Sequence, residues 1–186
     1  LTSGPCPTSP NNLLTGETDL CPFFVPLTGL SDTLTYTVPA VPGITRYNWV
    51  LPSGATQVAG DTTNSIGVVF DTTVLSRYGD GFIYVGTVSN LGIHCLNYAF
   101  TRVYFNKPRL DNISGVTDIC PYIDVDTPIT YSIPLANHTT SYQWSVPAGV
   151  SIFSGQGTNT VQLKFTSAFV SGSKISVTGI ANCGTS

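Results

Sequence analysis

Charge is scarce in this sequence. Charged residues make up only 9% of its 186 residues, against roughly a quarter in an average soluble domain. Surface helices usually carry charged residues along a solvated face, so this scarcity argues against a helical protein. The seven Lys and Arg residues are dispersed and the formal net charge is −3, whereas phosphate binding needs clustered positive charge. We therefore expect no nucleic-acid partner.

Other absences exclude further classes of protein. No run approaches the roughly 18 consecutive apolar residues that a spanning helix needs, so we expect no membrane insertion. The chain has no Met, which predicts a segment of a longer polypeptide. Its single Glu is Glu17, and no pair of carboxylates stands out of the kind that glycosidases use. We therefore predict no catalytic residue, no cofactor and no enzyme activity.

Apolar and turn-forming residues are abundant instead. Hydrophobic residues make up 41% of the chain, which also holds 18 Gly and 13 Pro. Short β-branched and aromatic runs lie at 34–38, 47–50, 65–70, 82–88 and 98–105, and again at 129–133, 142–146, 160–165 and 174–180. Runs of this kind, separated by Gly, Pro and Asn, are typical of antiparallel sandwiches. The sequence therefore predicts an all-β fold, Ig-like, with little helix.

The chain also contains an internal repeat. Ten residues of one copy stand again, as the same residue types, 95 positions later. In the first copy they are Tyr36, Pro39, Tyr47, Trp49, Pro52, Gly54, Gly60, Thr63, Asn64 and Phe70. The offset is 99 upstream of this block and 92 downstream, so the length differences fall in loops. We predict two tandem domains, at 11–106 and 107–186, after a linker or the end of a preceding domain at 1–10.

The repeated frame resembles a known type of repeat. Both copies carry Ile/Leu-x-Gly-x-Thr-Asp-x-Cys, Tyr-x-Trp-x-x-Pro-x-Gly and Gly-x-x-Thr-Asn, and the second ends in Asn-Cys-Gly-Thr-Ser. These motifs are similar to the PKD-like, Ig-like tandem repeats of large secreted surface proteins of Bacteroidota. That group includes gliding-motility adhesins and other cargo of the type IX secretion system. The resemblance implies an extracellular, cell-surface location and supplies no ligand.

The same resemblance implies a pattern of O-glycosylation. Members of this phylum glycosylate Asp-Ser/Thr motifs that are followed by a hydrophobic residue or Thr. Three Asp-Thr pairs fit this pattern, with the acceptors Thr33, Thr62 and Thr72. We treat these three threonines as candidate modification sites.

Five cysteines in a chain of this composition indicate an oxidising compartment. Pairing within each copy is the simplest arrangement, Cys21 with Cys95 and Cys120 with Cys183. Cys6 is then left over, and either it pairs outside this segment or it competes with Cys21 for Cys95. The sequence leaves the connectivity open.

Two groups of residues have both a functional and a structural interpretation. Trp49 and Trp144 are of the type that stacks on sugars, but their identical placement in the two copies predicts core residues like the Trp of Ig domains. The densest acidic group is Asp111, Asp118, Asp124 and Asp126. Calcium binds six or more oxygens, so these four are candidate calcium ligands. The alternative is that they are solvated loop acids, with Asp118, like Asp19, capping a turn.

Two functions remain from these observations. The first is a structural and adhesive stalk segment of a secreted surface protein, whose partners are other domains of the same protein and an unknown polysaccharide or protein ligand. The alternative is an accessory carbohydrate-binding module of a secreted multidomain enzyme. The second copy has no counterpart of residues 96–105. We therefore expect its last strand to be missing from this sequence, or to come from another chain at the 183–186 edge.

Overall fold

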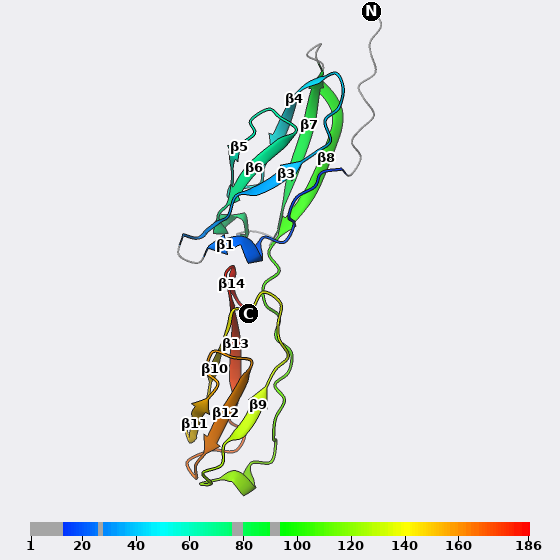
Figure 1. Ribbon diagram of the computed structural model, residues 1–186. Helices are drawn as coiled ribbons and strands as arrows, with labels where there is room; N and C mark the ends of the chain where they lie inside the picture. Colours follow the sequence, from blue (N-terminus) through cyan, green and yellow to red (C-terminus); the bar gives the residue numbers. More distant parts are fainter. Residues whose placement is uncertain (1–12, 26–27, 76–79, 90–93) are drawn as a thin grey trace, which may run out of the picture. The chain divides into compact units, whose positions relative to one another are not determined.

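We analysed a computed structural model of the chain, which describes residues 13–25, 28–75, 80–89 and 94–186. The chain divides into two compact units, Leu1–Phe105 and Asn106–Ser186. Both are tandem Ig-like β-sandwiches built from antiparallel sheets, which confirms the predicted fold class (Figure 1). Helix is limited, in the described residues, to the 3-10 turns η1 (Cys21–Phe23), η2 (Thr72–Leu75) and η3 (Cys120–Tyr122).

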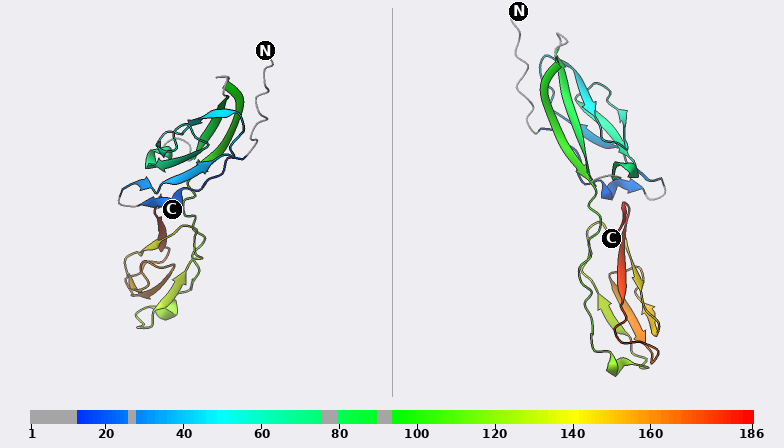
Figure 2. Two further views of the ribbon diagram at one scale, coloured as in Figure 1. Left: turned by 45° about the horizontal axis from the view of Figure 1, so that its top comes forward. Right: turned by 180° about the vertical axis from the view of Figure 1, so that it is seen from behind.

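The first unit packs two sheets face to face. Its strands are β1 (Phe24–Val25), β2 (Leu30–Ser31), β3 (Leu34–Thr37), β4 (Ile44–Val50), β5 (Ala55–Ala59), β6 (Ser65–Phe70), β7 (Asp80–Ser89) and β8 (His94–Tyr104). One sheet has the order β3-β6-β5 and the other β4-β7-β8, while β1 and β2 form a small hairpin. Figure 2 shows the two layers from two further directions.

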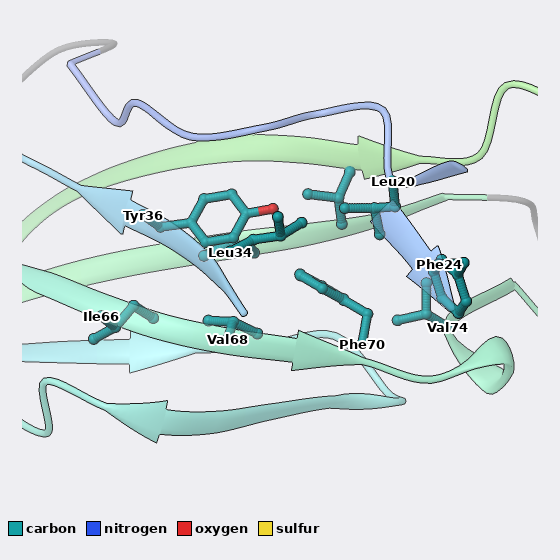
Figure 3. Packing of buried hydrophobic residues seen from close by; sticks show 10 residues of the cluster. Leu20, Phe24, Leu34, Tyr36, Ile66, Val68, Phe70 and Val74 are labelled. Carbon is teal, nitrogen blue, oxygen red and sulfur yellow. The ribbon is translucent and has the colours of Figure 1, made fainter. Parts of the chain in front are cut away.

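Alternation along the strands builds the core between these layers. In β3 the side chains of Leu34 and Tyr36 point inward and are buried, while Thr35 is exposed. The main buried cluster draws on both sheets and on the segment before β1 (Figure 3). Its members are Leu20, Phe24, Leu34, Tyr36, Ile66, Val68, Phe70, Val74, Ile83 and Val103.

The second unit repeats this plan with shorter sheets. Its strands are β9 (Ile129–Ser132), β10 (Ser141–Ser145), β11 (Val150–Ser154), β12 (Thr160–Phe165), β13 (Ser176–Ala181) and β14 (Gly184–Thr185). The orders are β11-β12-β9 and β10-β13-β14. Its core centres on Tyr131, Tyr142, Trp144 and Phe165, each less than 10% exposed.

Five strands lie outside the predicted runs: the two-residue strands β1, β2 and β14, and the longer strands β5 and β11. Strands β5 and β11 pair with β6 and β12 in both units, yet neither has a buried residue. Their alternation runs between half-buried and exposed side chains, so the apolar signal that marks the other strands is weak. The four extra residues of the first copy fall in the segment that forms the β1–β2 hairpin, which the second unit lacks.

Candidate functional site

The repeated residues form one hydrogen-bond network, which is the same in both units. The indole Nε1–H of Trp49 donates to the carbonyl oxygen of Thr63 at 2.8 Å. Trp144 donates to Thr158 at the same distance. Trp144 is only 3% exposed, and Trp49 is half-buried against the core. The interpretation of the two Trp residues as core rather than sugar platforms is confirmed for Trp144, whereas Trp49 packs against the core at its margin.

The Gly-x-x-Thr-Asn motif forms the turn that receives this indole. In the second unit the Thr158 hydroxyl donates to the carbonyl oxygens of Gly155 and Thr160, at 3.0 and 2.6 Å. Gly155 has a φ of +90° and a Cβ there would lie 2.2 Å from the Thr160 oxygen, so the position requires glycine. The Asn159 amide then donates to the Ile133 carbonyl at 2.9 Å. The turn is thereby fixed to the neighbouring strand end.

The first Tyr of the repeated block, Tyr36 in one copy and Tyr131 in the other, fixes the segment that precedes the sandwich. The hydroxyl of Tyr36 donates to the Glu17 carbonyl, and that of Tyr131 to the Val116 carbonyl, each at 2.7 Å. Burial raises the pKa of both phenols, and for Tyr36 the Glu17 charge adds to the effect. Because the ring of Tyr131 lies against Gly115, a Cβ there would sit 2.2 Å from Cδ1 of the ring. These Tyr residues are structural.

Two of the four candidate calcium ligands bind backbone instead. The Asp118 carboxylate accepts the Cys120 N–H at 3.1 Å, as Asp19 does in the first unit. This is the turn-capping role that the sequence suggested. Asp124 adopts a φ of +58° and accepts the Ser167 N–H at 3.0 Å.

The other two are solvated. Asp126 lies 2.6 Å from the Lys164 ammonium, which holds the pKa of this carboxyl below its usual range, first by its hydrogen bond and then by its charge. Asp111 is exposed. In the described part of the chain, no group of three or more His, Cys, Asp or Glu residues comes together that could hold a metal ion. The four aspartates therefore do not converge on a calcium site.

Neither predicted disulfide agrees with the structure. Cys21 follows Leu20, whose N–H donates to the Tyr104 carbonyl at the end of β8. Cys95 lies at the other end of β8, and at about 3.3 Å per residue the two ends are roughly 30 Å apart. A disulfide needs Cα atoms within about 7 Å. The Cys21–Cys95 pairing is therefore wrong.

The second predicted pair fails for a simpler reason. Cys120 is a free, exposed thiol, whereas Cys183 is disulfide-bonded. Cys21 is also disulfide-bonded and fully buried. Spacing along the sequence could not show that the two cysteines of one copy lie at opposite ends of its sandwich. Cys6 lies outside the described residues.

The candidate glycosylation sites differ in accessibility. Thr33 is exposed beside β3, and Thr62 is half-buried. The side chain of Thr72 is outside the described residues. Of the two described side chains, Thr33 is the more accessible.

An unexpected cluster of aromatic side chains lies on the outer face of the β4-β7-β8 sheet. Phe82 and Tyr84 on β7 are each 39% exposed, and Phe100 on β8 is 52% exposed. Their ring centroids lie 5.9 to 6.1 Å apart, so each ring contacts the other two. We call these three residues the aromatic face. Val50, which pairs with Tyr84 on the neighbouring strand, extends it and is 56% exposed.

The second unit has polar residues at the corresponding positions. With the downstream offset of 92, Phe82 corresponds to Lys174 and Tyr84 to Ser176. Val50 corresponds to Ser145 at the offset of 95. The sandwich therefore does not require aromatic residues there. The sequence patterns did not reveal the aromatic face, because the four consecutive apolar residues 82–85 indicate only a strand. A position-by-position comparison of the two copies could have revealed it, since the second copy has polar residues there.

Comparison with known proteins places the chain. The model of a family described as PKD-like domain matches residues 9–78 and 107–186. The chain belongs to the PKD-like domain family. Domains of this kind are commonly extracellular adhesion or structural domains and are typically not catalytic. The aromatic face lies beyond the matched range 9–78.

The other comparisons add little. No curated protein matches the chain. Among solved structures, the human desmocollin-1 ectodomain is 12% identical, with a TM-score of 0.33 over 87% of this chain and 31% of that one. The chain spans less than a third of that ectodomain's length, and the likeness is too distant to inform its function. The short 3-10 turns of the described residues are not long enough to cross a membrane.

Proposed function

We propose that this chain is a structural and adhesive segment of a secreted cell-surface protein, which spaces and displays binding surfaces outside the cell. The aromatic face is the observation that carries this proposal. It exposes three mutually contacting rings that the second copy lacks, whereas the repeated Tyr36, Trp49 and Asn64 make hydrogen bonds within the fold. With roughly 200 Å² for each aromatic side chain, the exposed part amounts to roughly 250 Å². The largest apolar patch on a typical monomer measures about 300–600 Å² and is often functional, and the exposed Val50 brings this face toward that size.

Two independent features support the proposed location. PKD-like domains are commonly extracellular, and the disulfide-bonded Cys21 and Cys183 favour an oxidising compartment. The motifs quoted above support a surface protein of the Bacteroidota type, exported by type IX secretion, with gliding adhesins as the nearest kind. The partners in this proposal are neighbouring domains of the same protein and the ligand of the aromatic face.

Adhesion by the aromatic face can be tested with a double variant that copies the second repeat. Phe82→Lys with Tyr84→Ser installs the residues that an equivalent sandwich already tolerates, so the fold should persist. Beads coated with the chain would be flowed over surfaces coated with bacterial polysaccharide or with host and matrix proteins. We expect the wild-type chain to hold beads and the double variant to release most of them.

A matched control keeps the result specific. Leu135→Ser removes a side chain that is 78% exposed in the second unit and belongs to no cluster. This variant should hold beads as the wild type does. Equal adhesion of the double variant and the wild type would contradict the adhesive role of the aromatic face.

The same three rings also favour the second candidate, an accessory carbohydrate-binding module. Aromatic side chains stack on the apolar faces of sugar rings, and the exposed Arg102, the strand partner of Phe82, adds hydrogen-bond donors for sugar hydroxyls beside them. A glycan array separates the two functions. Binding to one class of soluble polysaccharide, lost in the double variant, would favour the module; adhesion to protein surfaces without glycan binding would favour the stalk alone.

A further inference from the structure

The second repeat has a groove at one end of its sandwich, lined by apolar core residues and by Thr117, Ser171 and Ser173. The groove measures about 260 Å³ and lies between two segments, 116–119 and 171–175. Core residues form its floor. The apolar residues that line it are Val116, Ile119, Tyr131, Phe165, Phe169 and Ile175.

The first repeat shows what fills this space in an equivalent sandwich. Val103 of β8 is fully buried there, in one cluster with four residues that correspond to the groove. These four are Leu20, Tyr36, Phe70 and Ile83, the counterparts of Ile119, Tyr131, Phe165 and Ile175. The groove is therefore the place that a side chain of a β8-like strand occupies in the first repeat.

Residues that are buried in the first repeat have more exposed counterparts in the second, as a missing strand would leave them. Leu20 and Ile83 are fully buried, whereas their counterparts Ile119 and Ile175 are only half-buried. Val85 of β7 is 1% exposed, whereas its counterpart Val177 in β13 is half-buried. The surface exposed in the second repeat is core surface in the first.

Backbone pairing agrees with side-chain burial. In the first repeat β8 pairs with β7 from Asp80 to Val88, and its Tyr104 exchanges backbone hydrogen bonds with Thr18 and Leu20. In the second repeat the described pairing of β13 on this side is confined to β14 and to the bond from the Ser186 N–H to the Gly179 carbonyl. The earlier half of β13 is an open strand edge.

Strand β14 already holds the first positions of such a strand. Thr185 pairs with Ile180 as His94 pairs with Val88, and Ser186 bonds to Gly179 at the place where Cys95 pairs with Thr87. A strand that ran on from Ser186 would therefore enter the groove in the register of β8. Its covalent attachment would spare it the association entropy that a separate strand must overcome.

We propose that the groove of the second repeat is the binding seat of a β-strand that continues β14 in the same polypeptide. The strand lies antiparallel to β13 and beside residues 117–119. It carries apolar side chains at the positions that match Ala99 and Val103, which are 1% and 0% exposed in the first repeat. Outward positions are free to vary.

The test extends the 186-residue chain with the chain's own strand. Residues 96–105 are copied after Ser186, where the register calls for them. Burial of the added apolar side chains should raise the melting temperature of the second repeat by roughly 10 °C, with the first repeat unchanged. The matched control has the same extension with Asp at the two positions copied from Ala99 and Val103, and it should give no rise.

A free peptide distinguishes the source of the strand. A synthetic peptide of residues 96–105 is titrated into the unextended chain and followed by calorimetry. A rise with the extension that its Asp control lacks supports the proposal. If the extension leaves the second transition unchanged while the free peptide binds, the seat belongs to a strand of another chain and the proposal is overturned. If neither has an effect, the groove is not a strand seat.

Discussion

The asparagine of the repeated turn offers the sharpest test of the shared scaffold. The Asn159 amide donates to the Ile133 carbonyl at 2.9 Å, and Asn64 donates to Val38 at 2.8 Å. Ile133 is 2% exposed and Val38 is fully buried, so each carbonyl oxygen lies beneath the half-buried Asn side chain that donates to it. Asn159→Ala therefore leaves a buried carbonyl oxygen without its side-chain partner.

The expected loss can be set from that geometry. A buried acceptor that loses its partner costs about 1–3 kcal/mol of unfolding free energy, and we take about 2 kcal/mol. In a unit of this size each kcal/mol corresponds to roughly 4–8 °C in melting temperature. Asn159→Ala should thus lower the transition of the second repeat by about 8–16 °C.

Differential scanning calorimetry measures this shift, and two variants serve as controls. Asn64→Ala should lower the transition of the first repeat by a similar amount. Asn137→Ala, on an exposed turn of the second repeat, should shift neither transition by more than about 2 °C. If Asn159→Ala behaved like Asn137→Ala, the turn would not anchor the sandwich and the structural explanation of the repeated motif would be refuted.

Three further outcomes can be stated. Burial raises the pKa of the Tyr36 phenol in the folded state, so the contribution of this phenol to stability is complete below pH 10. Above pH 10 the contribution falls by about 1.4 kcal/mol per pH unit. Tyr36→Phe should therefore flatten the pH dependence of the unfolding free energy between pH 10 and 11, measured by urea unfolding. Gly115→Ala drives a Cβ into the ring of Tyr131 and should cost the second repeat about 1–3 kcal/mol, measured by urea unfolding, and a neutral result would show that the ring can shift. Iodoacetamide should label Cys120 in the native, unreduced protein and Cys183 only after reduction, which peptide mass spectrometry would show; labelling of Cys183 before reduction would contradict the bonding described here.

The fold could be predicted from the sequence because the strand patterns are local and the turn motifs occur in both copies. Each Trp, Thr and Asn of the frame makes the same bond in both units, so repetition marked the positions that the sandwich requires. Alternation of apolar and polar residues in runs such as 34–38 then predicted which side chains of each strand point toward the core. Strands β5 and β11 were missed since they lie at the sheet margin and bury no side chain completely.

The cysteine pairs could not be read in this way. Disulfide pairing depends on which end of the sandwich each residue reaches, and that is set by the direction of the strands. Cys21 and Cys95 are 74 positions apart, yet β8 carries the second of them away from the end where the first lies. Sequence separation alone fixes the entropy of a loop and not the distance between its ends.

Identity between the two copies indicates residues that the fold requires, and a difference marks positions that the fold leaves free. The residues that recur, including both Trp residues that first suggested sugar binding, are engaged in the core or in its turns. The aromatic face occurs in one copy only, at positions where Lys174 and Ser176 show that the fold tolerates polar side chains. Three exposed rings at such positions lack the hydrophobic benefit of burial in the isolated sandwich, and the proposed contact with a partner would bury them. The double variant Phe82→Lys with Tyr84→Ser should therefore remove the proposed contact and leave the sandwich folded. A display unit requires this independence of the binding residues from the residues that hold the fold.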